Sequence, residues 1–181
     1  LQLDTQFGNK YLVCADISSC YPSVYTHSLS WALIGKLKAK KFSTNTPDNN
    51  KLWYNRIDKA CQILQDGETR GLPIGPDTSV VLSEMILSKV DQELRKYNYV
   101  RFIDDFKCSC KTMEKAEEFI RDLSKALDKF RLSINSKKTK ILEYPQAIND
   151  DWVRKLRMAI DWKTIGVKEK DKVIGFLDLS S

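Results

Sequence analysis

The sequence has no apolar run that approaches the roughly 18 residues of a membrane-spanning helix, and no signal peptide is visible in it. Its five cysteines form no CxxC pair, so they indicate neither a zinc site nor a disulfide framework. We therefore expect a protein of a reducing, cytoplasmic compartment that does not cross a membrane.

Histidine is nearly absent, because His27 is the only one among 181 residues. No partner for an acid–base pair stands near it in the sequence, so we expect His27 to be structural. The charge is unbalanced, since 30 Lys and Arg residues exceed 24 Asp and Glu residues and give a net charge of +6. This excess favours an anionic partner, nucleic acid first and an anionic membrane surface second, although an ordinary solubilised surface also fits it.

The pattern of residues 99–111 predicts a β-hairpin. Residues 99–103 are aromatic and β-branched, and residues 106–111 alternate apolar with polar side chains. The turn between them carries two adjacent carboxylates, Asp104 and Asp105. Because Asp hydrogen-bonds its own backbone at turns, such a pair alone does not indicate a functional site.

Elsewhere the sequence predicts further strands and helices. Residues 17–28 are expected to be irregular. Ser30 is expected to cap a short first helix, Asp77 or Thr78 to cap the third helix, and Thr112 to cap the fourth. The other expected strands are 11–16 and the last strand material at 132–134 and 139–144, and the expected helices are 31–41, 52–65, 77–96 and the one that follows residue 112.

The order of these elements indicates an α+β fold. Without the segment between residues 28 and 76 it is β-α-β-β-α-β, the ferredoxin-like arrangement of an antiparallel sheet with helices on one face. The first and third strands are central neighbours in that topology. Asp16, at the end of the first strand, is therefore expected to lie beside Asp104 and Asp105.

Three carboxylates brought this close repel one another unless cations lie among them. Mg²⁺ prefers oxygen ligands, and two such ions activate an attacking hydroxyl and stabilise a leaving pyrophosphate. The residues thus point to metal-assisted nucleotidyl transfer, with Asp16 and either Asp104 or Asp105 as ligands. In another interpretation Asp105 orients the site instead of binding metal.

Four stretches support this chemistry in the order 16–23 (DISSCYPS), 70–79 (RGLPIGPDTS), 102–105 (FIDD) and 132–139 (LSINSKKT). Together they resemble the palm motifs A, B, C and D of reverse transcriptases. Three stretches are most similar to the bacterial antiphage-defence and abortive-infection reverse transcriptases: residues 16–36, the GLPIGP stretch and the DDWVRKL stretch.

The resemblance implies a role for each matching residue. Asp16, Asp104 and Asp105 with the backbone carbonyl of Ile17 would ligate the metals, and Lys138 would protonate the departing pyrophosphate. Arg70 and Gly71 would contact nucleic acid. The implied nucleotide-binding residues are Ile17, Ser18, Ser19, Cys20, Tyr21, Pro73, Ile74 and Gly75.

Two of these positions bear on the substrate. Tyr21 matches the aromatic steric gate that excludes a ribose 2′-OH, which indicates deoxynucleotides. Ile74 stands where many reverse transcriptases carry Gln, and an Ile side chain cannot hydrogen-bond near the nucleotide sugar. The resemblance therefore leaves open whether synthesis follows a template.

The leading hypothesis is an RNA-directed DNA polymerase of antiphage defence that uses dNTPs, an RNA template and a DNA or RNA primer, with two Mg²⁺ ions that Mn²⁺ can replace. The alternatives are an untemplated or protein-primed polymerase of the same family and a non-catalytic RNA- or protein-binding module. A nucleotide cyclase ranks lower, since its Gly-Gly hairpin is absent. No membrane partner is expected.

Within such an enzyme, residues 1–145 would form the palm with an inserted fingers segment at about 30–70. Residues 146–181 would begin the connection to a thumb or helical region. The sequence begins with Leu1, so we expect a piece of a longer protein that folds but is inactive alone, with any homo-oligomer formed through regions outside it.

Overall fold

The computed structural model describes residues 8–43 and 47–143; residues 1–7, 44–46 and 144–181, and with them the expected thumb connection, lie outside the described residues. The elements in chain order are β1 (Tyr11–Asp16), α1 (Cys20–Ser23), α2 (His27–Ile34), α3 (Lys36–Lys41), the 3₁₀ turn η1 (Asn49–Lys51), α4 (Trp53–Ile63), α5 (Asp77–Glu93), β2 (Tyr99–Phe102), β3 (Asp105–Cys110), α6 (Met113–Asp128) and β4 (Lys140–Glu143).

The strands form one antiparallel sheet in the order β2-β3-β1-β4, so the fold is α+β as expected. The predicted central position of β1 and β3 is confirmed. Their register places Tyr11 opposite Cys110 and Asp16 opposite Asp105. The two ends that carry carboxylates therefore meet at one end of the sheet.

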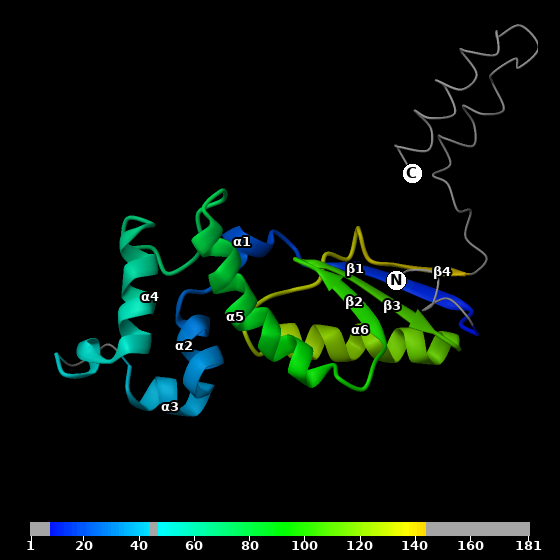
Figure 1. Ribbon diagram of the computed structural model, residues 1–181, viewed down its shortest axis with the longest axis horizontal. Coiled ribbons are helices and arrows are strands. Elements are labelled where there is room, and N and C mark those ends of the chain that lie inside the picture. Colours follow the sequence, from blue (N-terminus) through cyan, green and yellow to red (C-terminus); the bar gives the residue numbers. More distant parts are fainter. Residues whose placement is uncertain (1–7, 44–46, 144–181) are drawn as a thin grey trace, which may run out of the picture. The chain divides into compact units, whose positions relative to one another are not determined.

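One face of the sheet is covered by helix. The alternation of β3 buries Phe106 and Cys108, and α6 packs its apolar stripe against β1 and β3 on this side. Figure 1 shows α6 running along the sheet with α5 beside it. Thr112 caps α6 as predicted, because its side-chain oxygen accepts a hydrogen bond from the Lys115 amide at 3.4 Å.

The expected helix at residues 31–41 is wrong in its bounds. Gly35 has a φ of +87°, a left-handed conformation that suits glycine, and it separates α2 from α3. Ser30 is not a cap, since it lies inside α2 and its hydroxyl donates to the carbonyl of Tyr54 at 3.1 Å. The supposedly irregular residues 17–28 also contain α1 and the start of α2.

Two further expectations need correction. The cap of α5 is Pro76 rather than Asp77 or Thr78. Residues 132–134 are not a strand, and only Ile134 forms an isolated bridge, with Ile17. His27 does have a partner, because its Nδ1–H donates to the Asp58 carboxylate on α4.

Candidate active site at the ends of β1 and β3

The hairpin between β2 and β3 closes with a two-residue turn. Ile103 adopts a left-handed φ of +56° in this turn, and Phe102 pairs with Asp105 across it. The amide of Ile17 donates to the carbonyl of Asp104 at 3.2 Å, which ties the end of β1 to the turn. All three aspartates thus meet at one end of the sheet.

Asp16 and Asp105 lie on the open face of the sheet. Directly paired residues of an antiparallel ladder share a face, and the alternation of β1 sends Ala15 with its partner Phe106 to the opposite, helix-covered side. Asp16 is nevertheless buried, with 6% of the residue exposed, whereas Asp105 is exposed. The pair therefore combines a fixed carboxylate with an accessible one.

The electrostatics of this cluster favour a cation. Burial, and then the negative charges of Asp104 and Asp16, raise the pKa of Asp105 above its ordinary value. A divalent cation among these carboxylates would relieve that repulsion, so their donor chemistry fits Mg²⁺. As placed in residues 8–43 and 47–143, however, no three His, Cys, Asp or Glu side chains converge into a formed metal cluster.

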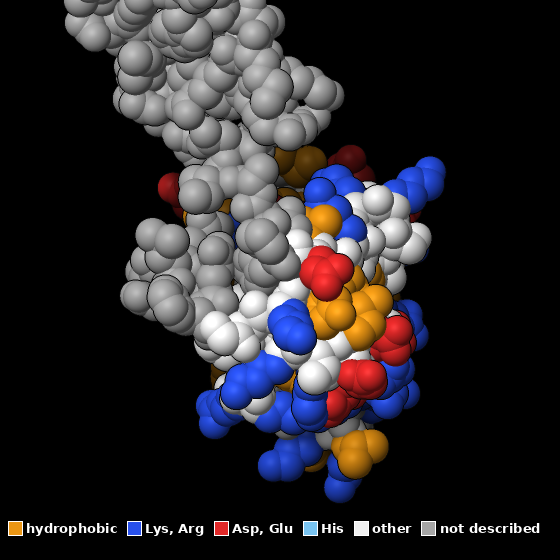
Figure 2. All heavy atoms as spheres, turned by 90° about the vertical axis from the view of Figure 1, so that its right-hand side faces the viewer, with side chains coloured by type: hydrophobic (Ala, Val, Ile, Leu, Met, Phe, Trp, Pro, Cys, Tyr) orange, Lys and Arg blue, Asp and Glu red, His pale blue; other side chains and the backbone are white. Residues whose placement is uncertain are grey.

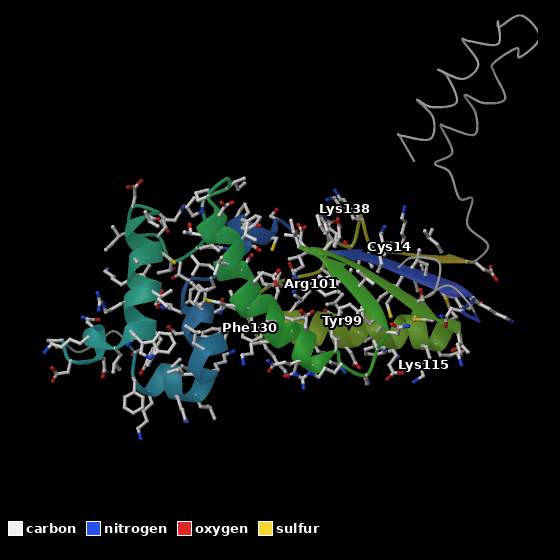
Figure 3. All side chains as sticks on the ribbon, viewed as in Figure 1. Cys14, Tyr99, Arg101, Lys115, Phe130 and Lys138 are labelled. Atoms are coloured by element: carbon white, nitrogen blue, oxygen red, sulfur yellow. The ribbon has the colours of Figure 1, made fainter. Side chains whose placement is uncertain are left out.

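Asp16 is instead held by the loop that precedes β4. Asn135 donates from its side-chain amide to Oδ2 of Asp16 at 3.1 Å and from its backbone amide to the Asp16 carbonyl at 2.7 Å. The ammonium of Lys138 lies 3.2 Å from the same Oδ2. This hydrogen bond and the charge of Asp16 raise the pKa of Lys138. Figure 3 shows Lys138 on the side of the sheet opposite α6.

Sequence reasoning missed Asn135. Its side-chain oxygen also accepts the backbone amides of Lys137 and Lys138, at 3.2 and 3.4 Å. The residue therefore shapes the turn that carries Lys138 and orients Asp16 at the same time. The only signal in the sequence is an Asn that opens a Ser- and Lys-rich turn.

Arg101 is a second missed residue, on the covered side of the hairpin. Its Nη1 donates to the carbonyl of Ile103 at 2.8 Å and to Glu84 at 2.6 Å, and its Nη2 donates to Asp91 at 2.7 Å. The hydrogen bonds that Arg101 donates to Glu84 outweigh the effect of burial and raise the pKa of Arg101. Figure 3 shows Arg101 between the sheet and α5, so this ion-pair network fastens the turn to α5.

The expected nucleotide-binding residues from Ser18 to Tyr21 directly follow β1. The amide of Ser18 is engaged, since it donates to the carbonyl of Ser133 at 2.9 Å. Ser19 is exposed with a left-handed φ of +47°, and Tyr21 is half-buried. Cys20 points inward, and burial followed by the charge of Asp104 raises the pKa of its thiol to about 11.

The glycine-rich loop before α5 is joined to this segment. Gly71 donates to the carbonyl of Val24 at 2.8 Å, and the amide of Leu72 donates to that of Tyr21 at 2.9 Å. Gly71 has a φ of +106°, a conformation that favours glycine.

The remaining loop residues named from the sequence are accessible to different extents. Arg70 and Gly75 are exposed, Pro73 is half-buried, and Ile74 is 77% exposed. The structure therefore brings the loop beside α1 and leaves its tip open.

The surface charge does not locate the site by itself. Figure 2 shows Lys and Arg side chains spread among acidic and hydrophobic ones on the face drawn there. Within the described residues, no helix is long and apolar enough to cross a membrane. The convergence of carboxylates at one end of the sheet is therefore what defines the site.

Comparison with known proteins gives one family. The family described as reverse transcriptase (RNA-dependent DNA polymerase) matches residues 2–177. No curated protein sequence matches the chain. A solved structure of apo telomerase from Candida tropicalis, truncated from the C-terminal domain, is similar with 17% identity and a TM-score of 0.47. The match covers 82% of this chain and 33% of the telomerase chain, so this chain spans about a third of its length.

Proposed function

Because this chain belongs to the reverse transcriptase (RNA-dependent DNA polymerase) family, a family of nucleotidyltransferases, we propose that its carboxylate site adds dNTPs to a primer on an RNA template. The observation that carries the proposal is the pairing of Asp16 with Asp105, with Asp104 in the adjoining turn. This is the cluster that motifs A and C predict.

Asp16, Asp104 and Asp105, with the carbonyl of Ile17, would hold two Mg²⁺ ions, which Mn²⁺ can replace. When bound, the ions would activate the primer 3′-hydroxyl and neutralise charge on the leaving pyrophosphate. Asn135 orients the carboxylate of Asp16 through its side-chain amide. The exposed carboxylate of Asp105 remains accessible to a cation.

Lys138 is proposed to be the proton donor to the leaving pyrophosphate. Its ammonium is exposed at the edge of the carboxylate cluster, and its raised pKa keeps it protonated at neutral pH. Asp16 fixes the lysine in the absence of substrate, and pyrophosphate oxygens would compete for the same donor. The role therefore requires Nζ to leave Asp16 for the product.

The substrate class is argued from the loop and from α1. Tyr21 lies beside Leu72 of the glycine-rich loop, where a tyrosine ring can exclude a 2′-hydroxyl. The exposed side chain of Ile74 offers no hydrogen bond to a nucleotide. Untemplated or protein-primed synthesis is therefore a second candidate function.

The proposed biological role comes from the amino-acid sequence. Similarity of residues 16–36 to antiphage-defence enzymes supports a role in bacterial defence, in the cytoplasm, where the five free cysteines would stay reduced. We assign residues 1–145 to the palm with its fingers segment at about 30–70, and residues 146–181 to the thumb connection.

The test is nucleotide incorporation by the full-length protein that carries this chain. Each dNTP and rNTP is supplied with Mg²⁺, with and without RNA, beside the Asp104→Ala/Asp105→Ala variant. Incorporation of dNTPs that needs RNA and disappears in the variant is the expected result. Incorporation without RNA would support the second candidate, and no metal-dependent incorporation would overturn both and favour a binding module.

A further inference from the structure

A cavity of about 260 Å³ lies apart from the carboxylate site, between α2, α3, α4 and the chain that follows α6. His27, Lys40 and Arg131 line it together with the aromatic rings of Tyr25 and Trp31. Its volume lies just below the roughly 300–1,000 Å³ of drug-sized ligand sites, which suits a phosphate group or a small phosphate ester. No motif of the nucleotidyl-transfer site lines it.

The imidazole of His27 is fixed by a hydrogen bond to a buried carboxylate. Asp58, 2% exposed, accepts a hydrogen bond from Nδ1–H of His27 and a second from Nε2–H of Gln62 at 2.8 Å. Burial would raise the pKa of Asp58, but the hydrogen bonds from His27, Thr26 and Gln62 lower it overall. The carboxylate is therefore ionised, and it fixes the imidazole so that Nε2 is the nitrogen left for a ligand.

Arg131 presents an unneutralised positive charge. Its guanidinium carbon lies 4.2 Å from the Tyr25 ring centroid and 5.6 Å from that of Trp31, so the cation lies within cation–π distance of both rings. Among the described residues, neither Arg131 nor Lys40 forms an ion pair with a carboxylate. The one carboxylate in the cavity wall, Asp58, is occupied by His27 and Gln62.

We propose that this cavity binds a phosphate monoester, with Arg131 as a two-pronged donor, protonated His27 as a donor from Nε2, and Lys40 as additional charge. Phosphate fits better than a carboxylate because a phosphate dianion matches the two cations, Lys40 and Arg131, that line one small space. The groups that face His27 are Asp58 from α4, Lys40 from α3, Arg131 from the chain after α6 and the Tyr25 ring beside it.

The phosphate could belong to a free nucleotide or to the 5′ end of a nucleic-acid strand. The affinities of the cavity for these two kinds of ligand distinguish the two sources. The proposal does not rest on polymerase activity, since it is measured without nucleotide incorporation. The carboxylate site is kept out of the assay by working without divalent metal, because its own charge repels phosphate.

The single histidine makes a direct test possible. In the full chain, the C2 proton of His27 is followed by NMR in EDTA-containing buffer. Orthophosphate, a nucleoside monophosphate, and 5′-phosphorylated and 5′-hydroxyl oligonucleotides are added in turn, with chloride at matched ionic strength as the blank. We expect phosphate to move the resonance toward its protonated position, and chloride to leave it unchanged.

A matched pair of arginine variants completes the test. Arg131→Gln should weaken the phosphate affinity about tenfold, because a charge-assisted hydrogen bond is lost. Arg56→Gln, an exposed arginine of α4 outside the cavity, should stay within about twofold. Tighter binding of the 5′-phosphorylated strand than of the monophosphate assigns a strand end, and equal binding assigns a nucleotide.

The proposal is overturned if millimolar phosphate leaves the His27 resonance where chloride does. It is also overturned if Arg131→Gln and Arg56→Gln weaken binding equally, since the effect would then be one of general surface charge. Loss of polymerase activity has no bearing on either outcome.

Discussion

Asp16 of β1 lies directly opposite Asp105 of β3, so two carboxylates occupy paired positions on the open face of the sheet. Facing acidic pairs destabilise a ladder, and the arrangement persists because Asn135 and Lys138 bond to Asp16. Such a site trades stability for the capacity to bind a cation.

Asp105→Asn should therefore stabilise the metal-free protein. The pKa of Asp105 is raised in the folded state, so its ionisation disfavours folding as pH rises above the ordinary value of 3.8. The neutral amide removes that cost, and the melting temperature at pH 7 should rise by a few degrees. Added Mg²⁺ should stabilise the unaltered chain and not the variant. A lower melting temperature for the variant without metal would contradict this.

Arg101→Met should destabilise the fold by about 2–3 kcal/mol, because Glu84 and Asp91 lose a partner whose side chain is 11% exposed. Urea unfolding measures the change. The control Arg121→Met breaks an exposed pair with Glu117 and should cost about 0.5 kcal/mol or less. In a Glu84→Gln background, Arg101→Met should lower the free energy of unfolding by less, since the two residues are coupled. Equal costs in both backgrounds would show that the network is not coupled.

Lys138→Ala in the full-length enzyme should lower the incorporation rate about 100-fold if the lysine delivers the proton. Lys137→Ala changes its exposed neighbour and should have little effect. The pKa of Lys138 is raised above 10.5, so the rate of the unaltered enzyme should not fall from loss of this proton between roughly pH 7 and 9. Equal rates for both alanine variants would exclude the role.

Asp58→Asn should make the free energy of unfolding fall less steeply as the pH is lowered below about 5. The pKa of Asp58 is lowered in the folded state. The ionised carboxylate therefore contributes fully to folding stability above its ordinary pKa of 3.8, and this contribution is lost as the pH falls through the lowered folded-state pKa. Urea unfolding at pH values from about 5 downward measures the slope. An unchanged slope in the variant would mean that the pair with His27 does not stabilise the fold.

The sheet and α6 could be predicted because their signals are local. Alternation in residues 106–111 and the apolar stripe after Thr112 each specify one buried face, and the β-α-β-β-α-β order then places Asp16 beside Asp105. The break at Gly35 was missed because the sequence on both sides of it favours helix. A left-handed glycine there is visible only in the backbone.

The supporting contacts could not be predicted in this way. Asn135 with Asp16, Arg101 with Glu84, and His27 with Asp58 each join distant parts of the chain. Periodicity does not specify such pairs, because they depend on how elements pack. The residues that carry charge at the site were thus predictable, while those that hold them in place were not.

The most direct test of the account is the rate of single-nucleotide incorporation by the full-length protein with Asp16→Asn, measured with Mg²⁺ beside Asp128→Asn. Asp128 is an exposed residue at the end of α6, so its variant matches the loss of one charge away from the site. The account predicts a loss of about 10²–10³-fold for Asp16→Asn and none for Asp128→Asn, with both variants folded by circular dichroism. A folded Asp16→Asn variant that incorporates nucleotides at the unaltered rate would contradict it.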